Sequence, residues 1–270
     1  MPKHITINSK NDINDIIGIS PNTDLISVED TGFYDWTLLI TNTGSQYLYK
    51  LTSIGNNQFF ADDTITRLVL GNIVETIGNS AFSTCSSLDG DLVIPDSVTT
   101  VGTNAFASAG FNGTLTLSRN PSYTDISEGA YKLNTFSGPL SIPENVDTIY
   151  SEAFTGCTGF TSLTIENGVQ ELQLQSFYGC TGLTTISIPS SCTSIDSNVF
   201  SNCSSVQTIY ADIPSENWVG TNALSNCGSA GSKLYVPDEK MSGYGSEGST
   251  GFQGFPGTFQ QWTSYPNPMP

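Results

Sequence analysis

The sequence is poor in charged residues, and above all in basic ones. Charged side chains make up 12% of the 270 residues, and 8 Lys and Arg stand against 25 Asp and Glu, which gives a formal net charge of -17 at pH 7. Soluble domains typically carry roughly 25% charged residues. Because a negative field repels phosphate backbones and anionic lipid surfaces, we expect no nucleic-acid partner.

Long apolar runs are also missing. No stretch of about 18 to 20 apolar residues occurs, and the longest runs, such as Leu38-Leu39-Ile40, have the length of a strand. We therefore expect no membrane span. The first 20 residues lack the apolar core of a signal peptide, so none is visible in this sequence.

Histidine occurs once, as His4, although Ser-His-Asp and Cys-His mechanisms both need a positioned imidazole. Acidic pairs such as Asp62 and Asp63 do not lie in an oxygen-rich loop of recognisable spacing, and no phosphate-binding glycine motif opens a helix. We predict that the protein is not an enzyme and has no catalytic, cofactor-binding or metal-binding residues.

The chain does contain a clear internal repeat. LVIPDSVTTVGTNAFASAGFN begins at Leu92, and LSIPENVDTIYSEAFTGCTGF begins at Leu140. Equivalent residues recur every 23 positions at Leu140, Leu163, Ile186 and Ile209. This period lies within the range of leucine-rich repeats, roughly 20 to 29 residues, and such units bury their apolar side by stacking on one another.

Each part of the unit has one structural role. The Leu-x-Ile alternation suits a short strand with one apolar side, and the proline that follows ends the strand because it cannot donate to a ladder. The Val-x-x-Ile segment returns the chain to the core. The Ala-Phe pair then places a ring in the interior, and these rings are expected to form one continuous stack: Phe82, Phe106, Phe154, Phe177 and Phe200.

The predicted fold is a leucine-rich-repeat solenoid, mainly β with short helical or 3-10 turns. One parallel sheet is built from coils of about 23 residues and is capped at both ends. Residues 1–60 are expected to form a β-rich cap continuous with the array, with strands near 5–7, 25–28, 36–41 and 47–51. Residues 61–237 form the solenoid. Residues 238–270 form a C-terminal cap or tail rich in Gly, Pro and aromatic residues.

The unit that starts at Leu115 is irregular, because Ala130-Tyr131 replaces Ala-Phe and KLNTFSG follows. We expect a bulged coil there, with a loop that protrudes near 132–138.

Cysteine recurs once per coil at one structural position. Stacked coils lie about 4.8 Å apart, but their Cβ vectors run parallel, so we expect buried free thiols rather than disulfides. Cys192 occupies a Val position and should be buried too. A straight stack cannot surround a tetrahedral zinc ion. The stacked positions are Cys85, Cys157, Cys180, Cys203 and Cys227.

Together, Leu-x-Ile-Pro, Val-x-x-Ile, Ala-Phe and Cys resemble the BspA-type leucine-rich repeat, from roughly Thr66 to Pro237. Gly71, Ser118 and Glu166 depart from this pattern where proline is expected, and Ala109 departs from it where Cys is expected. The resemblance implies an adhesion or recognition module that is extracellular or on the cell surface.

The outward residue of each strand should line up into a column on the sheet. On this face we predict partner-binding residues at Tyr210, Tyr235, Trp218, Thr164 and Ser187, with a protein or a glycan as ligand. The alternative reading, that Thr, Ser and Tyr are simply good strand formers, stays open. In isolation the chain should be a monomer.

A second function from another class also stays open. The protein would then be a structural component of a larger assembly, such as a virion or an extracellular layer. In that case the aromatic segment 238–270 would be its attachment point.

Overall fold

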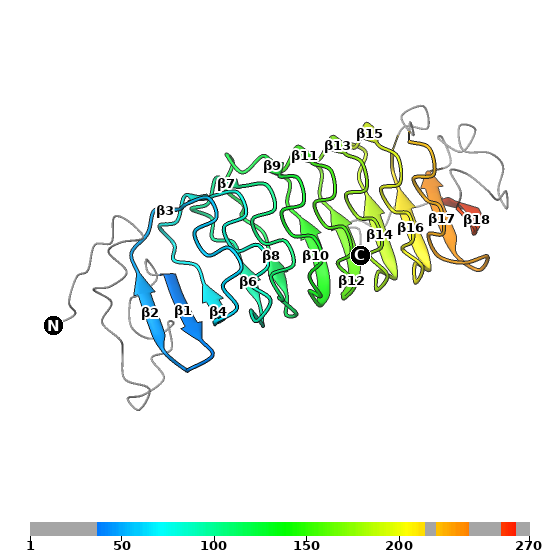
Figure 1. The fold of residues 1–270 in the computed structure, drawn as a ribbon. Coiled ribbons are helices and arrows are strands. Elements are labelled where there is room, and N and C mark those ends of the chain that lie inside the picture. Colours follow the sequence, from blue (N-terminus) through cyan, green and yellow to red (C-terminus); the bar gives the residue numbers. More distant parts are fainter. Residues whose placement is uncertain (1–36, 214–219, 238–254, 263–270) are drawn as a thin grey trace.

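The structure, a computed structural model, describes residues 37–213, 220–237 and 255–262. They form a parallel β-solenoid of about eight coils, which confirms the predicted fold (Figure 1). These residues contain no helix: turns connect the strands where short helical or 3-10 segments were expected.

The leading strands of the coils lie side by side along the solenoid. Their alternation places one side chain in the core and the next one outside, as for Leu163, Thr164 and Ile165. In chain order the strands are β4 (Ile65–Val69), β6 (Leu92–Val93), β8 (Leu115–Thr116), β10 (Gly138–Ile142), β12 (Phe160–Ile165), β14 (Thr185–Ile188), β16 (Thr208–Ala211) and β17 (Lys233–Pro237). We call this side of the solenoid the sheet face.

Most of the sheet face is one six-stranded parallel sheet in the order β10-β12-β14-β16-β17-β18, and β6 pairs with β8 before it. The last strand, β18 (Thr258–Trp262), lies in the segment expected to form a cap or tail, and it pairs in parallel along β17. Phe255 is fully buried in the same core. Part of the C-terminal segment therefore belongs to the array.

A second ladder of two-residue strands runs along another side of the solenoid (Figure 1). It comes from the Val-x-x-Ile segments, and it pairs in parallel as β3-β5-β7 and β9-β11-β13-β15. The bounds are β3 (Ser53–Ile54), β5 (Thr76–Ile77), β7 (Thr100–Val101), β9 (Asp125–Ile126), β11 (Thr148–Ile149), β13 (Glu171–Leu172) and β15 (Ser194–Ile195).

At the N-terminal end the pairing becomes antiparallel. β1 (Thr37–Thr41) pairs with β2 (Gln46–Tyr49) and also with β4, the first long strand of the array. These strands match those predicted near 36–41 and 47–51, whereas the strands predicted near 5–7 and 25–28 lie outside the described residues. Backbone hydrogen bonds thus join β1 directly to β4.

The core contains the predicted aromatic stack. Neighbouring rings have centroids 5.0 to 5.8 Å apart and nearly parallel planes, for example 5.1 Å and 10° between Phe154 and Phe177. Phe59 extends the stack at its start, and Tyr131 fills the place of phenylalanine in the irregular coil. Offset stacked rings add to the stability that burial alone supplies.

The segment around each ring forms a third ladder, which the sequence analysis did not anticipate. The residues two before and two after the ring both have positive φ, as at Ser80 (52°) and Thr84 (60°) around Phe82. The amide groups of Ser80, Phe82 and Thr84 then all donate to carbonyls of the next coil, at 2.7 to 2.9 Å. We call this the turn ladder.

The left-handed conformation costs roughly 1 to 2 kcal/mol for residues other than glycine. Asn, Gly and Ser occupy many of the turn-ladder positions, but Leu133, Glu152 and Gln175 also adopt it. The hydrogen bonds between coils offset this strain, so backbone pairing and not side-chain preference dictates the turn.

The prediction of a protruding loop near 132–138 was wrong. Asn134 takes the place of the repeat cysteine, is 1% exposed, and donates from Nδ2 to the carbonyls of Phe106 and Tyr131 at 2.8 Å. Phe136 is buried between Phe111 and Phe160. The side-chain amide of Asn134 and the ring of Phe136 therefore keep this turn packed against the core.

The two extra residues of the irregular coil lie elsewhere, in the turn after β8. Six positions separate Leu117 from Tyr123, whereas four separate the equivalent Ile94 and Val98. Arg119 and Asn120 lie in this longer turn.

The cysteines are free and buried, as predicted. Cys157 donates its thiol to the carbonyl of Tyr131 at 3.2 Å, and Cys180 does the same to that of Phe154. Cys192 is 1% exposed. Burial raises the pKa of Cys157 to about 12, so this thiol stays protonated and unreactive at neutral pH.

Candidate binding face

The central column of the sheet face is in the predicted register. Thr164 pairs with Ser187, Ser187 with Tyr210, and Tyr210 with Tyr235. These four residues project outward because the alternate positions of their strands, such as Ile186 and Ile188, are buried in the core. Trp218, the remaining predicted site residue, lies outside the described residues.

Exposure changes along this column. Thr116 and Ser141 are exposed, Thr164 is half-buried, and Ser187 is only 1% exposed. The expectation that Ser187 presents an open surface was therefore wrong, although its position in the column is as predicted.

Tyr210 and Tyr235 stack on each other in the column. Their ring centroids are 5.4 Å apart at an interplanar angle of 21°, and both residues are half-buried. The two rings form an aromatic pair in the C-terminal part of the column, next to Gln260 of β18, and they are the residues at which the strongest contacts were predicted.

A second column, two residues earlier on the same strands, is made of hydroxyls. Ser162 pairs with Thr185, and Thr185 with Thr208, and all three are half-buried. The two columns form a grid on β12, β14 and β16 in which every position but one carries an aliphatic hydroxyl. The exception is Tyr210.

The aliphatic hydroxyls of this grid have no hydrogen-bond partner in the part of the chain that the structure describes. Within the described residues, Ser162, Thr164, Thr185 and Thr208 make no side-chain hydrogen bond, and the Oγ of Ser187 is buried without a partner. Elsewhere on the solenoid the hydroxyls hold coils together. Ser127 donates to the carbonyl of Val101 at 2.6 Å, for example.

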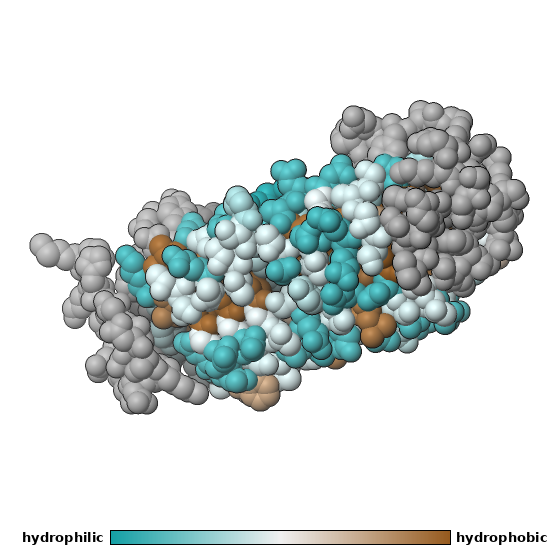
Figure 2. All heavy atoms as spheres, turned by 90° about the horizontal axis from the view of Figure 1, so that it is seen from above, coloured by the Kyte–Doolittle hydropathy of each residue, from teal (hydrophilic) through white to brown (hydrophobic). Residues whose placement is uncertain are grey.

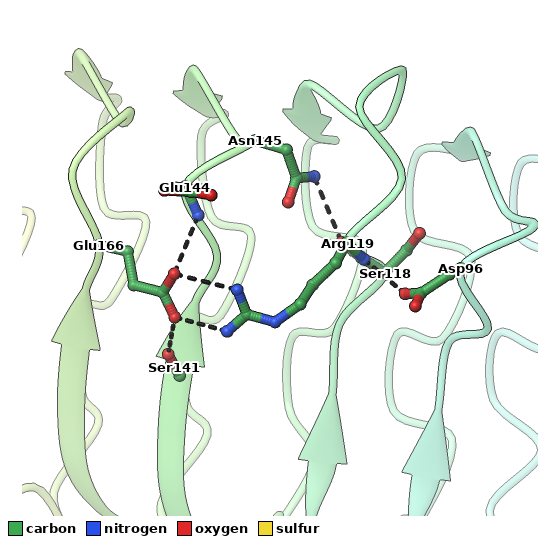
Figure 3. A network of polar contacts seen from close by, with 7 residues as sticks. All are labelled: Asp96, Ser118, Arg119, Ser141, Glu144, Asn145 and Glu166. Carbon is green, nitrogen blue, oxygen red and sulfur yellow. Dashed lines mark hydrogen bonds and ion pairs between the residues drawn. The ribbon is translucent and has the colours of Figure 1, made fainter.

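A charged cluster borders the grid (Figure 3). Arg119 reaches across one coil to form two hydrogen bonds with Glu166, of 3.1 Å from Nη1 and 2.6 Å from Nη2. Ser141 donates to the same carboxylate at 2.9 Å, and the amide of Glu144 does so at 3.3 Å. The guanidinium holds the pKa of Glu166 below its ordinary value.

Sequence reasoning did not identify this cluster as a site. The available signal was the replacement of the repeat proline by Ser118 and Glu166 in two nearby coils. Because Ser118 is followed by two additional residues, Arg119 sits in a longer turn from which it reaches Glu166. The sequence gives no direct sign of this reach, since the two residues are 47 positions apart.

The described residues show no arrangement typical of catalysis or metal binding. No group of three or more Cys, His, Asp or Glu side chains among them is placed to hold a metal ion, and the single histidine lies outside them. No helix of that part of the chain has the length and hydropathy to cross a membrane. The chemistry available on the sheet face is hydrogen bonding and aromatic contact.

Comparison with known proteins gives the same architecture. A family model described as the BspA type leucine rich repeat region matches residues 52–138 and 124–240, in six copies. The crystal structure of a leucine-rich repeat protein from Bacteroides ovatus is 20% identical, with a TM-score of 0.51, and the match covers 83% of this chain and 67% of that chain.

A leucine rich cell surface protein from Faecalibacterium prausnitzii is 18% identical, with a TM-score of 0.47, and the match covers 80% of this chain and 72% of that chain. No curated protein matches the chain. The Bacteroides structure shares the solenoid fold.

Proposed function

Since the chain belongs to the BspA-type leucine-rich repeat family, we propose that it is a non-enzymatic binding module that recognises a protein or glycan through its sheet face. The main support is the grid of aliphatic hydroxyls on β12, β14 and β16 that have no hydrogen-bond partner among the described residues. The stacked pair of Tyr210 and Tyr235 adds aromatic contact area next to it.

We place this activity at a cell surface or outside the cell. The support is the resemblance to BspA-type repeats, which occur in surface-exposed and secreted proteins. Labelling intact producing cells with an antibody against the protein tests the location. Signal that appears only after the cells are permeabilised would refute it.

The binding role is tested by blocking the face. Thr116→Arg with Thr164→Arg places two long side chains on the sheet face, at threonines whose hydroxyls make no hydrogen bond within the described residues. Thr100→Arg with Thr124→Arg is the matched control, because these exposed threonines lie at the short-strand ladder. Wild type and both variants are applied to printed arrays of glycans and of surface and secreted proteins, after circular dichroism has shown that each is folded.

We expect at least one arrayed ligand to bind wild type and the control but not the face variant. Equal loss in both variants, or no binding by folded wild type on either array, would contradict the proposal.

The structural alternative, a component of a larger assembly attached through 238–270, has less support. Thr258–Trp262 of that segment pairs along β17 as part of the sheet, and Phe255 is in the core. These residues serve the fold of the chain itself, so they offer no separate attachment point.

A further inference from the structure

The hydroxyl grid differs from the other hydroxyls of the solenoid in what it bonds to. Thr184 donates to the carbonyl of Thr161 in the preceding coil at 2.9 Å, whereas the adjacent Thr185 makes no side-chain hydrogen bond within the described residues. Ser97 and Ser191 likewise donate to backbone carbonyls. At the half-buried grid positions, such as Thr164 and Thr185, the same chemical group has no partner among the described residues and is left available to solvent or a ligand.

Ser187 supplies an independent sign of a ligand. Its Oγ is buried, points to the outer side between Thr164 and Tyr210, and has no hydrogen-bond partner. Leaving a buried polar group unsatisfied costs about 1 to 3 kcal/mol. A ligand hydroxyl that reached Ser187 after a local rearrangement of its neighbours would relieve this cost.

The chemistry of the face selects a class of ligand. A hydroxyl both donates and accepts, so a grid of hydroxyls complements a ligand that also carries donors and acceptors at many points. Sugar chains have this property, and the rings of Tyr210 and Tyr235 offer apolar surface for the C–H side of a sugar. The formal net charge of -17 disfavours anionic polymers.

A protein partner fits this surface less well. Protein interfaces have a core enriched in aromatic and other apolar residues. Of the five large hydrophobic residues that are exposed in the described part, only Val93 (52%) projects from the sheet face. Figure 2 views the solenoid from above, on the side where the short strands lie in Figure 1, and there the described surface is mainly hydrophilic or intermediate with separate hydrophobic patches.

On these observations we propose that the sheet face binds a neutral glycan chain, with Thr164, Thr185 and Thr208 as hydrogen-bonding residues and Tyr210 and Tyr235 as the aromatic contact. This inference rests on the proposed function, because it names the ligand class of the same face. It commits to a sugar that carries no charge.

The test is affinity electrophoresis of the whole chain through native gels that contain mannan, laminarin or xyloglucan, with polygalacturonate as the anionic comparison. Thr164→Val with Thr185→Val removes two hydroxyls while keeping the shape and strand preference of the side chains. Thr184→Val is the matched control, because it removes a neighbouring hydroxyl that bonds internally. Thermal unfolding of each variant is measured alongside.

We expect at least one neutral polysaccharide to retard wild type, and polygalacturonate not to. The Thr164→Val, Thr185→Val variant should bind at least about tenfold more weakly with unchanged thermal stability, since two hydrogen bonds to the ligand are lost. Thr184→Val should show the reverse, with lower stability and unchanged retardation.

Each other outcome overturns the inference. Retardation by polygalacturonate alone contradicts the charge argument, and retardation that survives in the Thr164→Val, Thr185→Val variant places the sugar site elsewhere. If no neutral polysaccharide retards the protein while the arginine variant of the face loses an arrayed protein ligand, the ligand class is wrong and the proposed function stands.

Discussion

The turn ladder and the sheet face contain the same types of residue, but these residues have different roles. On the turn ladder, Asn, Ser and Thr adopt left-handed backbone conformations and every second amide donates to the next coil. On β12, β14 and β16 of the sheet face, Ser and Thr sit in ordinary strands and their hydroxyls have no hydrogen-bond partner within the described residues. The turn side is therefore built for stability, and the sheet side is available for recognition.

This difference predicts that substitutions separate cleanly. Substitutions of the core residues next to the turn ladder should alter the free energy of unfolding without altering ligand binding. Substitutions on the sheet face should alter ligand binding without altering the free energy of unfolding.

The largest effect is expected for Phe177→Ala. Phe177 is 1% exposed and stacks between Phe154 and Phe200, so removing its ring leaves a cavity and should lower the free energy of unfolding by about 3 to 5 kcal/mol. Phe59→Ala, at the open end of the stack, is the control and should cost less. Urea denaturation measures both, and equal losses would contradict the idea of a continuous stack.

A smaller loss is expected for Asn134→Ala, which removes the amide that bonds the carbonyls of Phe106 and Tyr131. These acceptors are then left without that donor, and stability should fall by about 1 to 3 kcal/mol. Asn134→Cys restores the repeat residue, whose thiol reaches the corresponding carbonyl in other coils. It should lose less than Asn134→Ala, and a greater loss would show that the corner does not depend on this donor.

A still smaller effect is expected for the bridge at the border of the sheet face. The side chains of Arg119 and Glu166 are 55% and 27% exposed, so Glu166→Gln should cost less than about 1 kcal/mol. Because the pKa of Glu166 is lowered in the folded protein, its contribution is present above the ordinary pKa of glutamate and is lost as the pH falls through the folded value.

Unfolding of wild type and Glu166→Gln at pH 7 and at pH 3 checks the sign. The difference between the two proteins should shrink at the lower pH. A difference that grows in acid would exclude the bridge as its source.

The smallest effect is expected for Ser187→Ala. The Oγ of Ser187 has no partner, so the substitution removes an unsatisfied buried group and should leave the free energy of unfolding unchanged or slightly raised. Ser176→Ala is a suitable comparison, since its hydroxyl is also buried and unpartnered but lies next to Phe177. A clear loss at Ser187 alone would show that its hydroxyl has a structural role.

The period of the chain was enough to predict the coils, the aromatic stack and the buried thiols. Each depends on residues that recur at fixed spacing, such as Phe154 and Phe177 or Cys157 and Cys180. The column of Thr164, Ser187, Tyr210 and Tyr235 followed for the same reason, because parallel strands of equal spacing bring equivalent residues together.

Features that break the period could not be predicted in the same way. The protruding loop of the irregular coil was predicted at 132–138, where the sequence differs from the repeat. In the structure, Asn134 replaces the repeat cysteine as a hydrogen-bond donor and Phe136 packs in the core, so this turn keeps its usual place in the coil. The burial of Ser187 and the hydrogen bonds from Arg119 to Glu166 depend on contacts between residues that are far apart in the chain, and a single sequence does not show which residues these are.

The turn ladder also gives the solenoid a net backbone dipole along its axis. In β-ladders the backbone dipoles largely cancel, but in the turn ladder the amides of every coil point toward the C-terminal end and the accepting carbonyls toward the N-terminal end. Their dipoles add, as they do along a helix. Within the described residues, the carbonyls of Asn56, Gln58 and Phe60 accept no backbone hydrogen bond, so the first coil presents the negative pole of the array.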